Sequence, residues 1–262
     1  KTPLASELSS VEPSQAKLLA ELEYCKYHRT HWISRHFSIK DVRGKVRRFD
    51  PLKPSQRKLA ALIDYSRRND MPCRIIVLKA RKTGVRTMCE ADMLCEVLAR
   101  GVDAMVVAHD KQTSEYVFDI TKRFYEFYDL PKPKLKRSNK GELRFYGHEG
   151  YIMVDTANNV MAGTGKTPQF LHANECSKWE HGAETATALF QAIGSVSGTT
   201  IILESTAYGF DDLFHPWWMK ASQHCDITWD DIDHPTVNVT NHNEWNGYLP
   251  LFIAWFDDPD YV

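Results

Sequence analysis

One basic loop and two acid-bearing segments contain the residue types that could bind and cleave a phosphate anhydride. The loop reads Lys79-Ala80-Arg81-Lys82-Thr83-Gly84-Val85-Arg86-Thr87. Its four cations could neutralise a triphosphate, and the hydroxyl of Thr87 could reach Mg²⁺. Taken alone, the loop is equally compatible with a solvated basic turn. Its assignment therefore depends on the segments that surround it.

The two acidic segments each follow a run of apolar residues. Asn174-Glu175 follows residues 170–173, and Glu204-Ser205-Thr206 follows residues 199–203. We expect Glu175 to orient or deprotonate an attacking water, with a plain strand-end carboxylate as the alternative. Asn174 would stand on the metal side, where an amide oxygen without charge predicts weaker metal affinity. The hydroxyls of Ser205 and Thr206 would sense the γ-phosphate.

A second glycine loop competes for the phosphate. Gly163-Thr164-Gly165-Lys166-Thr167 matches the G-K-T ending of a phosphate loop. Such a loop works because a strand precedes it and a helix start follows it, so that backbone N–H groups face the anion. Here Pro168 and an expected strand follow, and Val160 stands where the motif has glycine. We therefore favour residues 79–87.

The pattern along the chain alternates strands and helices. Expected strands cover residues 74–78, 103–108, 143–146, 151–154, 170–173, 199–203 and 249–255, and expected helices cover residues 12–29, 55–65, 87–98, 112–128 and 183–193, with a basic loop at 132–140. Continuous apolar strands separated by helices predict an α/β fold with a mostly parallel sheet covered on both faces. Ligands of such sheets bind outside the carboxyl ends of the strands.

Composition narrows the class of protein. Hydrophobic residues make up 43% and charged residues 26%, and no apolar run is long enough to predict a membrane span. The net charge of −1 hides an asymmetry, because residues 221–262 carry eight acids and neither Lys nor Arg, which leaves 33 basic and 26 acidic side chains in the first 220 residues. A basic face on that part could contact a polyanion.

Cysteine and histidine spacing does not predict a metal site. The six cysteines show no C-x-x-C pair and are expected to be reduced, buried and cytosolic. His28 and His31 form H-x-x-H, but no second ligand pair follows at metal spacing. Surface or packing roles are therefore favoured over zinc.

In sequence order, the motifs are K-A-R-x-x-G-x-x-T, G-x-G-x-T-P, h-h-H-x-x-E, E-S-T-A-x-G and W-F-x-D-P-x-Y. This set, from about Leu52 to Tyr261, resembles the ATPase domain of the large terminase subunit of tailed bacteriophages. The resemblance implies a P-loop NTPase of the ASCE/RecA-like kind, with residues 1–50 as a helical lobe or lid and residues 51–262 as the ATPase domain. The family's nuclease domain would begin about where the chain stops, so we expect no DNA cleavage and no nuclease role for Asp257 and Asp258.

The resemblance also assigns roles by position. Gln56 would recognise adenine, residues 79–87 would form a deviant Walker A loop with Arg81 as its catalytic arginine, Asn174-Glu175 would end the Walker B strand, and residues 205–207 would couple hydrolysis to motion. ATP and Mg²⁺ would be the cofactors, with Thr87, Asn174 and Glu175 on the metal. Two positions depart from the family: Arg86 stands where Ser or Thr is usual, and Thr164 where Arg is frequent. Arg137 or Arg144 could then serve a neighbouring subunit as an arginine finger.

The resemblance implies a motor that couples Mg-ATP hydrolysis to translocation of double-stranded DNA into a procapsid. Residues 132–140 would contact DNA phosphates without reading bases. Expected partners are the portal protein, the small terminase subunit and further copies of the chain in a ring, with a monomer in isolation, in the cytoplasm of the infected host. The alternatives are a nucleotide-binding or DNA-docking module with little turnover, and a helicase-like P-loop ATPase.

Overall fold

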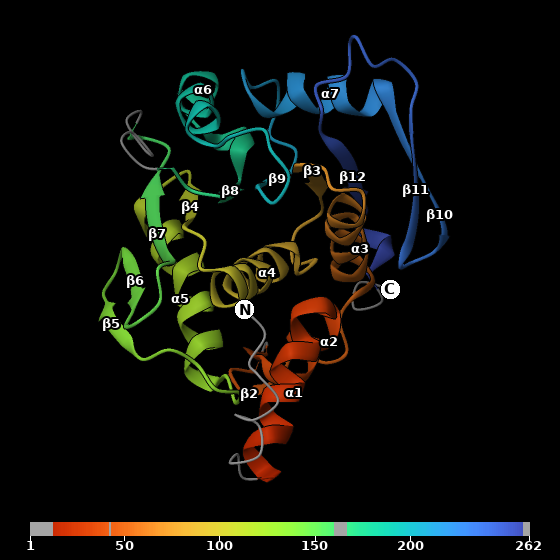
Figure 1. Cartoon of the computed structure of the whole chain (residues 1–262). Helices are drawn as coiled ribbons and strands as arrows, with labels where there is room; N and C mark the ends of the chain where they lie inside the picture. The colour runs from red at the N-terminus through yellow and green to blue at the C-terminus, as the bar shows by residue number, and fades with distance from the viewer. Residues whose placement is uncertain (1–12, 42, 160–166, 259–262) are drawn as a thin grey trace.

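A twisted eight-stranded sheet forms the centre of the molecule (Figure 1). The structure is a computed structural model that describes residues 13–41, 43–159 and 167–258. The strand order is β12-β3-β9-β8-β4-β7-β6-β5. In that order, the bounds are β12 (Leu249–Ile253), β3 (Cys73–Lys79), β9 (Thr200–Ser205), β8 (Phe170–Asn174), β4 (Ala104–Ala108), β7 (Tyr151–Thr156), β6 (Glu142–Phe145) and β5 (Leu135–Ser138).

The strands from β12 to β7 run parallel to one another, and β6 and β5 add an antiparallel edge. Strands β4, β8 and β9 are buried along their whole length, as expected for strands covered on both faces. The predicted mostly parallel α/β sheet is confirmed. One expectation was wrong: residues 132–140 are not all loop, because residues 135–138 form β5 and pair with β6.

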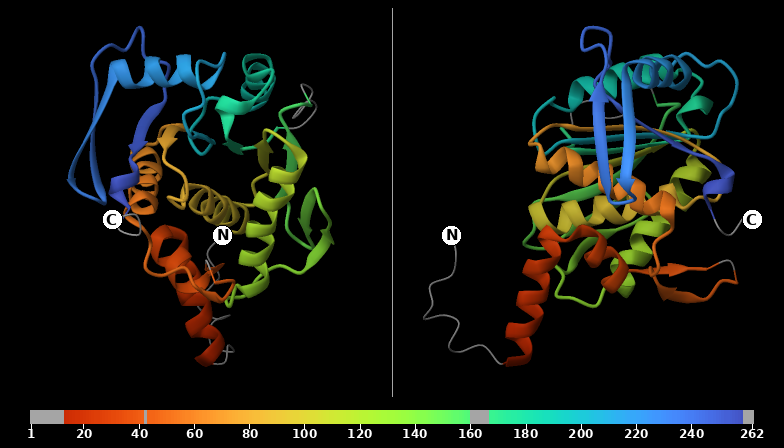
Figure 2. Two further views of the ribbon diagram at one scale, coloured as in Figure 1. Left: turned by 180° about the vertical axis from the view of Figure 1, so that it is seen from behind. Right: turned by 90° about the vertical axis from the view of Figure 1, so that its right-hand side faces the viewer.

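Helices cover both faces of this sheet (Figures 1 and 2). One layer consists of α3 (Pro54–Arg68), α4 (Val85–Arg100) and α5 (Lys111–Phe127), and the other of α6 (Gly182–Ala192) and α7 (Phe214–His224). Each layer closes its own apolar core, one containing Leu62 and Phe118 and the other Leu171 and Leu189. No helix in the described residues is long and apolar enough to cross a membrane.

The chain enters through two short helices rather than the single helix predicted over residues 12–29. Helix α1 (Pro13–Tyr27) ends before His28, and α2 (Arg29–His36) begins directly after it. The physical reason lies in α2, where buried Arg29 pairs with Glu96 at 2.6 Å and buried Trp32 donates its Nε1–H to the Tyr128 hydroxyl at 2.8 Å. A straight helix could not place these side chains against α4 and α5. The hairpin of β1 (Ser38–Lys40) and β2 (Val46–Arg48) follows.

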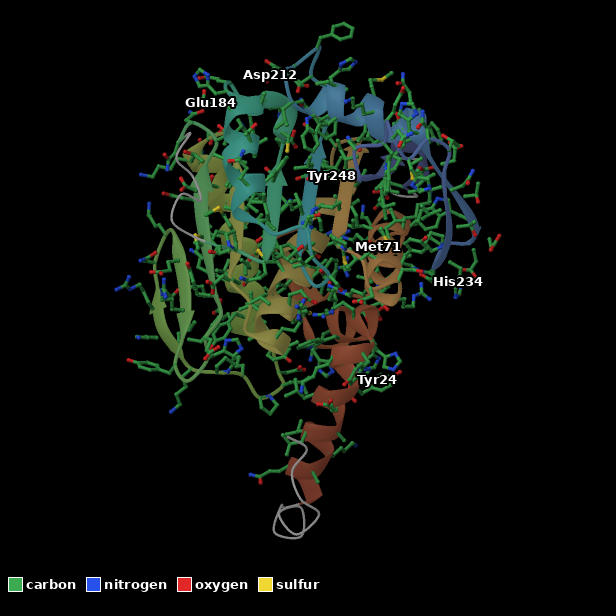
Figure 3. All side chains as sticks on the ribbon, turned by 45° about the horizontal axis from the view of Figure 1, so that its top comes forward. Tyr24, Met71, Glu184, Asp212, His234 and Tyr248 are labelled. Carbon is green, nitrogen blue, oxygen red and sulfur yellow. The ribbon has the colours of Figure 1, made fainter. Side chains whose placement is uncertain are left out.

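The acidic carboxyl-terminal part forms a second hairpin that the pattern did not predict. Strands β10 (Cys225–Asp231) and β11 (His234–Val239) pair antiparallel and lie beside β12 and α3 (Figure 1). Asp233 at its turn pairs with Arg57 on α3. Figure 3 shows Glu184 and Asp212 at the end of the molecule opposite Tyr24, with His234 at the tip of this hairpin.

Candidate active site

The basic loop connects the end of β3 to the start of α4, as the phosphate-loop mechanism requires. Lys82 (φ 60°) and Gly84 (φ 82°) both adopt the left-handed conformation, and α4 begins at Val85. A left-handed turn before a helix start turns backbone N–H groups toward one point and adds the positive end of the helix dipole. The loop borders a cavity of about 600 Å³. Its lining includes Lys53, Lys79, Arg81, Lys82, Thr83, Gly84, Val85, Arg86, Thr87, Tyr116 and Glu175.

Gln56 supports the loop from beneath and does not line the cavity. Its amide nitrogen donates to the Gly84 carbonyl at 3.0 Å, and its amide oxygen accepts from the Lys53 N–H at 2.9 Å. The side chain is 3% exposed. Gln56 therefore holds the glycine turn in place, and contact with adenine stays a prediction.

We expect Gly84→Ala to destabilise the protein by more than the cost of a left-handed φ alone, which is about 1 kcal/mol. A Cβ at this position would lie 2.4 Å from the Gln56 amide nitrogen. Gly209 is the matched control, since it has φ 72° but nothing within 4 Å of its Cβ position. Urea unfolding of Gly84→Ala, Gly209→Ala and Gly84→Ala/Gln56→Ala measures the difference. Equal losses in the two single variants would contradict the steric argument.

Two glutamates lie at the carboxyl edge of the sheet, opposite the loop. Glu204 on β9 is in register with Val77 on β3 and Asn174 on β8, so its side chain lies between the two other strands. It is fully buried, and the Lys79 ammonium lies 2.9 Å from its Oε2. The same Lys79 Nζ is 3.3 Å from Glu175 Oε1. The last residue of the loop strand is thus held by both acids.

Glu175 is the residue where the cations and the cavity meet. Arg86 Nη2 lies 3.3 Å from its Oε1, and Lys178 Nζ lies 3.2 Å from its Oε2. The Thr206 hydroxyl donates to Oε2 at 3.1 Å. The Glu175 backbone is left-handed, with φ 52° and ψ 48°, a conformation that costs a non-glycine residue about 1–3 kcal/mol. Strain of this kind concentrates at sites where a side chain must be aimed.

The electrostatics keep both carboxylates ionised. Burial and the neighbouring Glu204 carboxylate raise the pKa of Glu175, but the ammonium groups of Lys79 and Lys178 outweigh them and hold it below its usual range. Burial likewise raises the pKa of Glu204, while Lys79, His172 and Arg86 lower it further. Burial lowers the pKa of Lys79, and the two glutamates reverse this and raise it. The result is a buried network of opposite charges.

We expect the free energy of unfolding to fall as the pH drops below about 4.5, the pKa of a free glutamate. A carboxyl group with a lowered folded pKa stabilises the protein above its unfolded pKa, and this stability is lost as the pH falls through the folded value. Urea unfolding from about pH 6 to pH 3 measures the slope. Glu204→Gln should flatten it, and an unchanged slope in that variant would contradict the assignment.

Comparisons with known proteins were made for sequence and for fold. No family profile and no curated protein matches the sequence. The large terminase of a thermophilic bacteriophage, in complex with ADP and with ATP-gamma-S, matches at 15% identity and a TM-score of 0.50, over 81% of this chain and 47% of that one. The Thermus phage P74-26 large terminase ATPase domain matches at 16% identity and a TM-score of 0.48, over 79% of this chain and 88% of that one.

The chain has the P-loop fold of a large terminase. It spans about half the length of the nucleotide-bound terminase that it matches. In this terminase fold, β9 lies between the loop strand β3 and the glutamate strand β8. That inserted strand is the feature of the ASCE class, and it places Glu204 within reach of both neighbours.

The predicted metal ligands are only partly brought together in the terminase fold. Thr87 and Glu175 line the same cavity. Asn174 is fully buried, and its amide nitrogen donates to Glu204. Its Oδ1 is a buried oxygen with no hydrogen-bond partner among the described residues. The donors therefore fit a hard cation at Thr87 and Glu175, with Asn174 behind the carboxylates.

The hydroxyl residues after Glu204 connect β9 to the segment that follows β8. The Ser205 and Ser177 hydroxyls lie 2.6 Å apart, and the Ser177 hydroxyl donates to the Thr206 carbonyl at 2.8 Å. Ser177 belongs to the 3₁₀ turn η2 (Cys176–Lys178). Ser205 is buried, so it links two strand ends, while Thr206 contacts Glu175 directly.

Sequence reasoning missed a buried relay behind the acids. His172 Nδ1 lies 2.6 Å from Glu90 Oε1, and its Nε2 lies 3.6 Å from Glu204 Oε1. Thr121 donates its hydroxyl to the other Glu90 oxygen. Burial lowers the pKa of His172, but Cys89, Glu204 and Glu90 raise it well above its usual range. The available signal was the acid Glu90 within an otherwise apolar helix face.

Several predicted residues lie elsewhere in the terminase fold. Arg137 and Arg144 both pair with Glu142 at the β5–β6 edge of the sheet. Asp258 pairs with Lys53, and Asp257 in the 3₁₀ turn η3 (Trp255–Asp257) accepts from the Ala254 N–H. The competing loop at residues 163–167 lies mostly outside the described residues.

Proposed function

We propose that the chain is the ATPase motor domain of a phage large terminase, which couples Mg-ATP hydrolysis to translocation of double-stranded DNA into a procapsid. One observation carries this proposal. The Lys79 ammonium and the Arg86 guanidinium both lie 3.3 Å from Oε1 of Glu175, beside a left-handed glycine turn at the edge of a parallel sheet. Phosphoryl transfer requires this combination of cations, helix start and a carboxylate that can act on water.

The residues divide the chemistry between them. The backbone of residues 80–84 and the side chains of Lys79, Arg81 and Arg86 would hold the phosphates, which would replace the glutamates as partners of Lys79. Glu175, released from Lys79, would orient the attacking water and accept its proton. Glu175 also lines an adjoining cavity of about 350 Å³ with His109 and Lys178, where such a water has room.

A bound Mg²⁺ would neutralise developing charge on the phosphates, and Thr87 and Glu175 are the residues placed to hold it. Thr206 would report the state of the site, because it contacts Glu175 and continues from β9. In this role it supports the predicted coupling function of Ser205 and Thr206.

DNA would be gripped through its phosphates. Lys134 and Lys136 on the β5 edge are exposed, whereas Lys132 donates to the carbonyls that end α5 and Lys140 pairs with Glu115. Contacts of this kind are independent of sequence and weaken with salt. The portal protein, the small terminase subunit, a homo-oligomeric ring and the cytoplasm of the infected host complete the proposal.

The test measures nucleotide affinity and turnover together. Purified protein is titrated with ATP-gamma-S and Mg²⁺ by calorimetry, and phosphate release from ATP is followed with and without linear duplex DNA and portal protein. Binding with turnover supports the motor. Binding without turnover under all conditions would favour the nucleotide-binding module, and strand separation of a forked duplex would favour the helicase-like alternative.

A further inference from the structure

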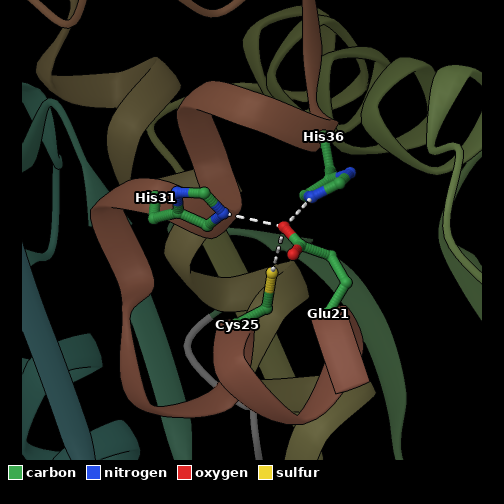
Figure 4. A group of neighbouring side chains, drawn as sticks. All are labelled: Glu21, Cys25, His31 and His36. Carbon is green, nitrogen blue, oxygen red and sulfur yellow. Dashed lines mark hydrogen bonds and ion pairs between the residues drawn. The ribbon is translucent and has the colours of Figure 1, made fainter. Parts of the chain in front are cut away.

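Four side chains that could ligate a metal converge between the two amino-terminal helices, far from the nucleotide loop (Figure 4). Glu21 and Cys25 come from α1, and His31 and His36 come from α2. One ligand atom from each lies within 4.8 Å of the other three. No other group of this kind occurs among residues 13–41, 43–159 and 167–258.

The helices explain how the four side chains meet. Glu21 and Cys25 are one turn apart and therefore share a face of α1. The break at His28 turns the chain back, so that His31 and His36 face that side of α1 (Figure 4). Glu21 Oε1 lies 2.8 Å from His31 Nε2, 3.0 Å from His36 Nε2 and 4.0 Å from Cys25 Sγ. Both imidazoles thus point the same nitrogen at one centre.

A second carboxylate orients His36 from behind. Asp129 Oδ1 lies 2.7 Å from His36 Nδ1, and Arg48 pairs with the other oxygen of Asp129. A carboxylate on the far nitrogen of an imidazole fixes the ring and directs its Nε2 lone pair, as it does for metal-binding histidines. This partner is independent of the four converging atoms.

The surroundings allow an ion to enter. A cavity of about 980 Å³ is lined by Glu21, His31, His36 and Asp129. Cys25 is fully buried at its inner side, while the His31 side chain is 39% exposed. The cluster therefore joins a dry thiol to a site that solvent can reach.

We propose that Glu21, Cys25, His31 and His36 bind a zinc ion that ties α1 to α2. One sulfur, two imidazoles and one carboxylate make four protein ligands, the number and kind that structural zinc sites use. The soft sulfur disfavours Mg²⁺ and Ca²⁺, which prefer oxygen. This assigns to His31 the metal role that its H-x-x-H spacing did not predict, whereas His28 stacks on Tyr24 at 3.9 Å.

The test uses the whole chain without an affinity tag, stripped of metal and titrated with Zn²⁺ alone. We expect one ion per chain, a higher melting temperature with Zn²⁺, and a thiolate charge-transfer band when Co²⁺ replaces it. Cys25→Ser should abolish the band and lower Zn²⁺ affinity at least tenfold, as should His31→Gln, whose exposed side chain makes unfolding no explanation. Asp129→Asn should weaken affinity about 10- to 100-fold with unchanged stoichiometry.

His28→Gln is the matched control, because it removes a neighbouring exposed histidine that lies outside the cluster. It should bind Zn²⁺ as the wild type does. Absence of stoichiometric binding, or a Co²⁺ spectrum without the thiolate band, would overturn the proposal. Equal affinity in His31→Gln and His28→Gln would overturn it too.

Discussion

Glu175→Gln is expected to lower the rate of ATP hydrolysis by about 10²- to 10⁴-fold while ATP binding is retained. The amide keeps the shape of the side chain but cannot accept a proton from water. The cations of the loop stay in place, and Lys79 keeps its contact with Glu204 at 2.9 Å. Single-turnover phosphate release, measured beside the affinity for ATP-gamma-S, separates chemistry from binding.

The control for this variant is Glu180→Gln, which removes an exposed carboxylate five residues along the same segment. It should hydrolyse ATP at the wild-type rate. Wild-type turnover in Glu175→Gln would show that the attacking water is activated elsewhere, and the role proposed for Glu175 would be withdrawn.

Lys79→Met is expected to destabilise the protein by about 3 kcal/mol, because it leaves the fully buried Glu204 without its nearest cation. Glu204→Gln in the same chain removes the unpaired charge, so the double variant should regain most of the loss. Neither variant that lacks Lys79 should bind ATP with wild-type affinity. Urea unfolding and ATP-gamma-S titration of the two single variants and the double variant separate the structural role of Lys79 from its role toward phosphate.

Lys58→Met provides the comparison for this cycle. Lys58 lies on α3 and is 3.8 Å from Asp257, with both side chains partly exposed, so its loss should cost less than about 1 kcal/mol. Equal stability of Lys79→Met and Lys58→Met would mean that Arg86, 3.8 Å from Glu204, compensates the buried charge by itself.

The sheet and the loop were predictable because each depends on local pattern. Fully apolar runs such as 104–108 can only be buried strands, and residues 79–87 had to join a strand to a helix for the loop to make chemical sense. The ends of β8 and β9 follow from the same rule, which brought Glu175 and Glu204 to one edge.

Long-range partners were not predictable from one sequence. His172 and Glu90 are 82 residues apart, and nothing in their own segments specifies that they meet. The break at His28 depends on Glu96 and Tyr128, which receive Arg29 and Trp32 from distant helices. Helix α7 contains Pro216 in its first turn, where proline is tolerated, and its sequence carries no regular apolar period.

The ion pairs of Lys79 and Arg86 with the two glutamates also have a thermodynamic consequence for ligand exchange. The acids act as internal counter-ions, so arrival of a triphosphate substitutes one set of anions for another instead of neutralising bare charge. Such a substitution yields less net free energy than the number of cations suggests. It also means that the carboxylates compete for the same cations when product leaves, and this competition favours turnover over retention.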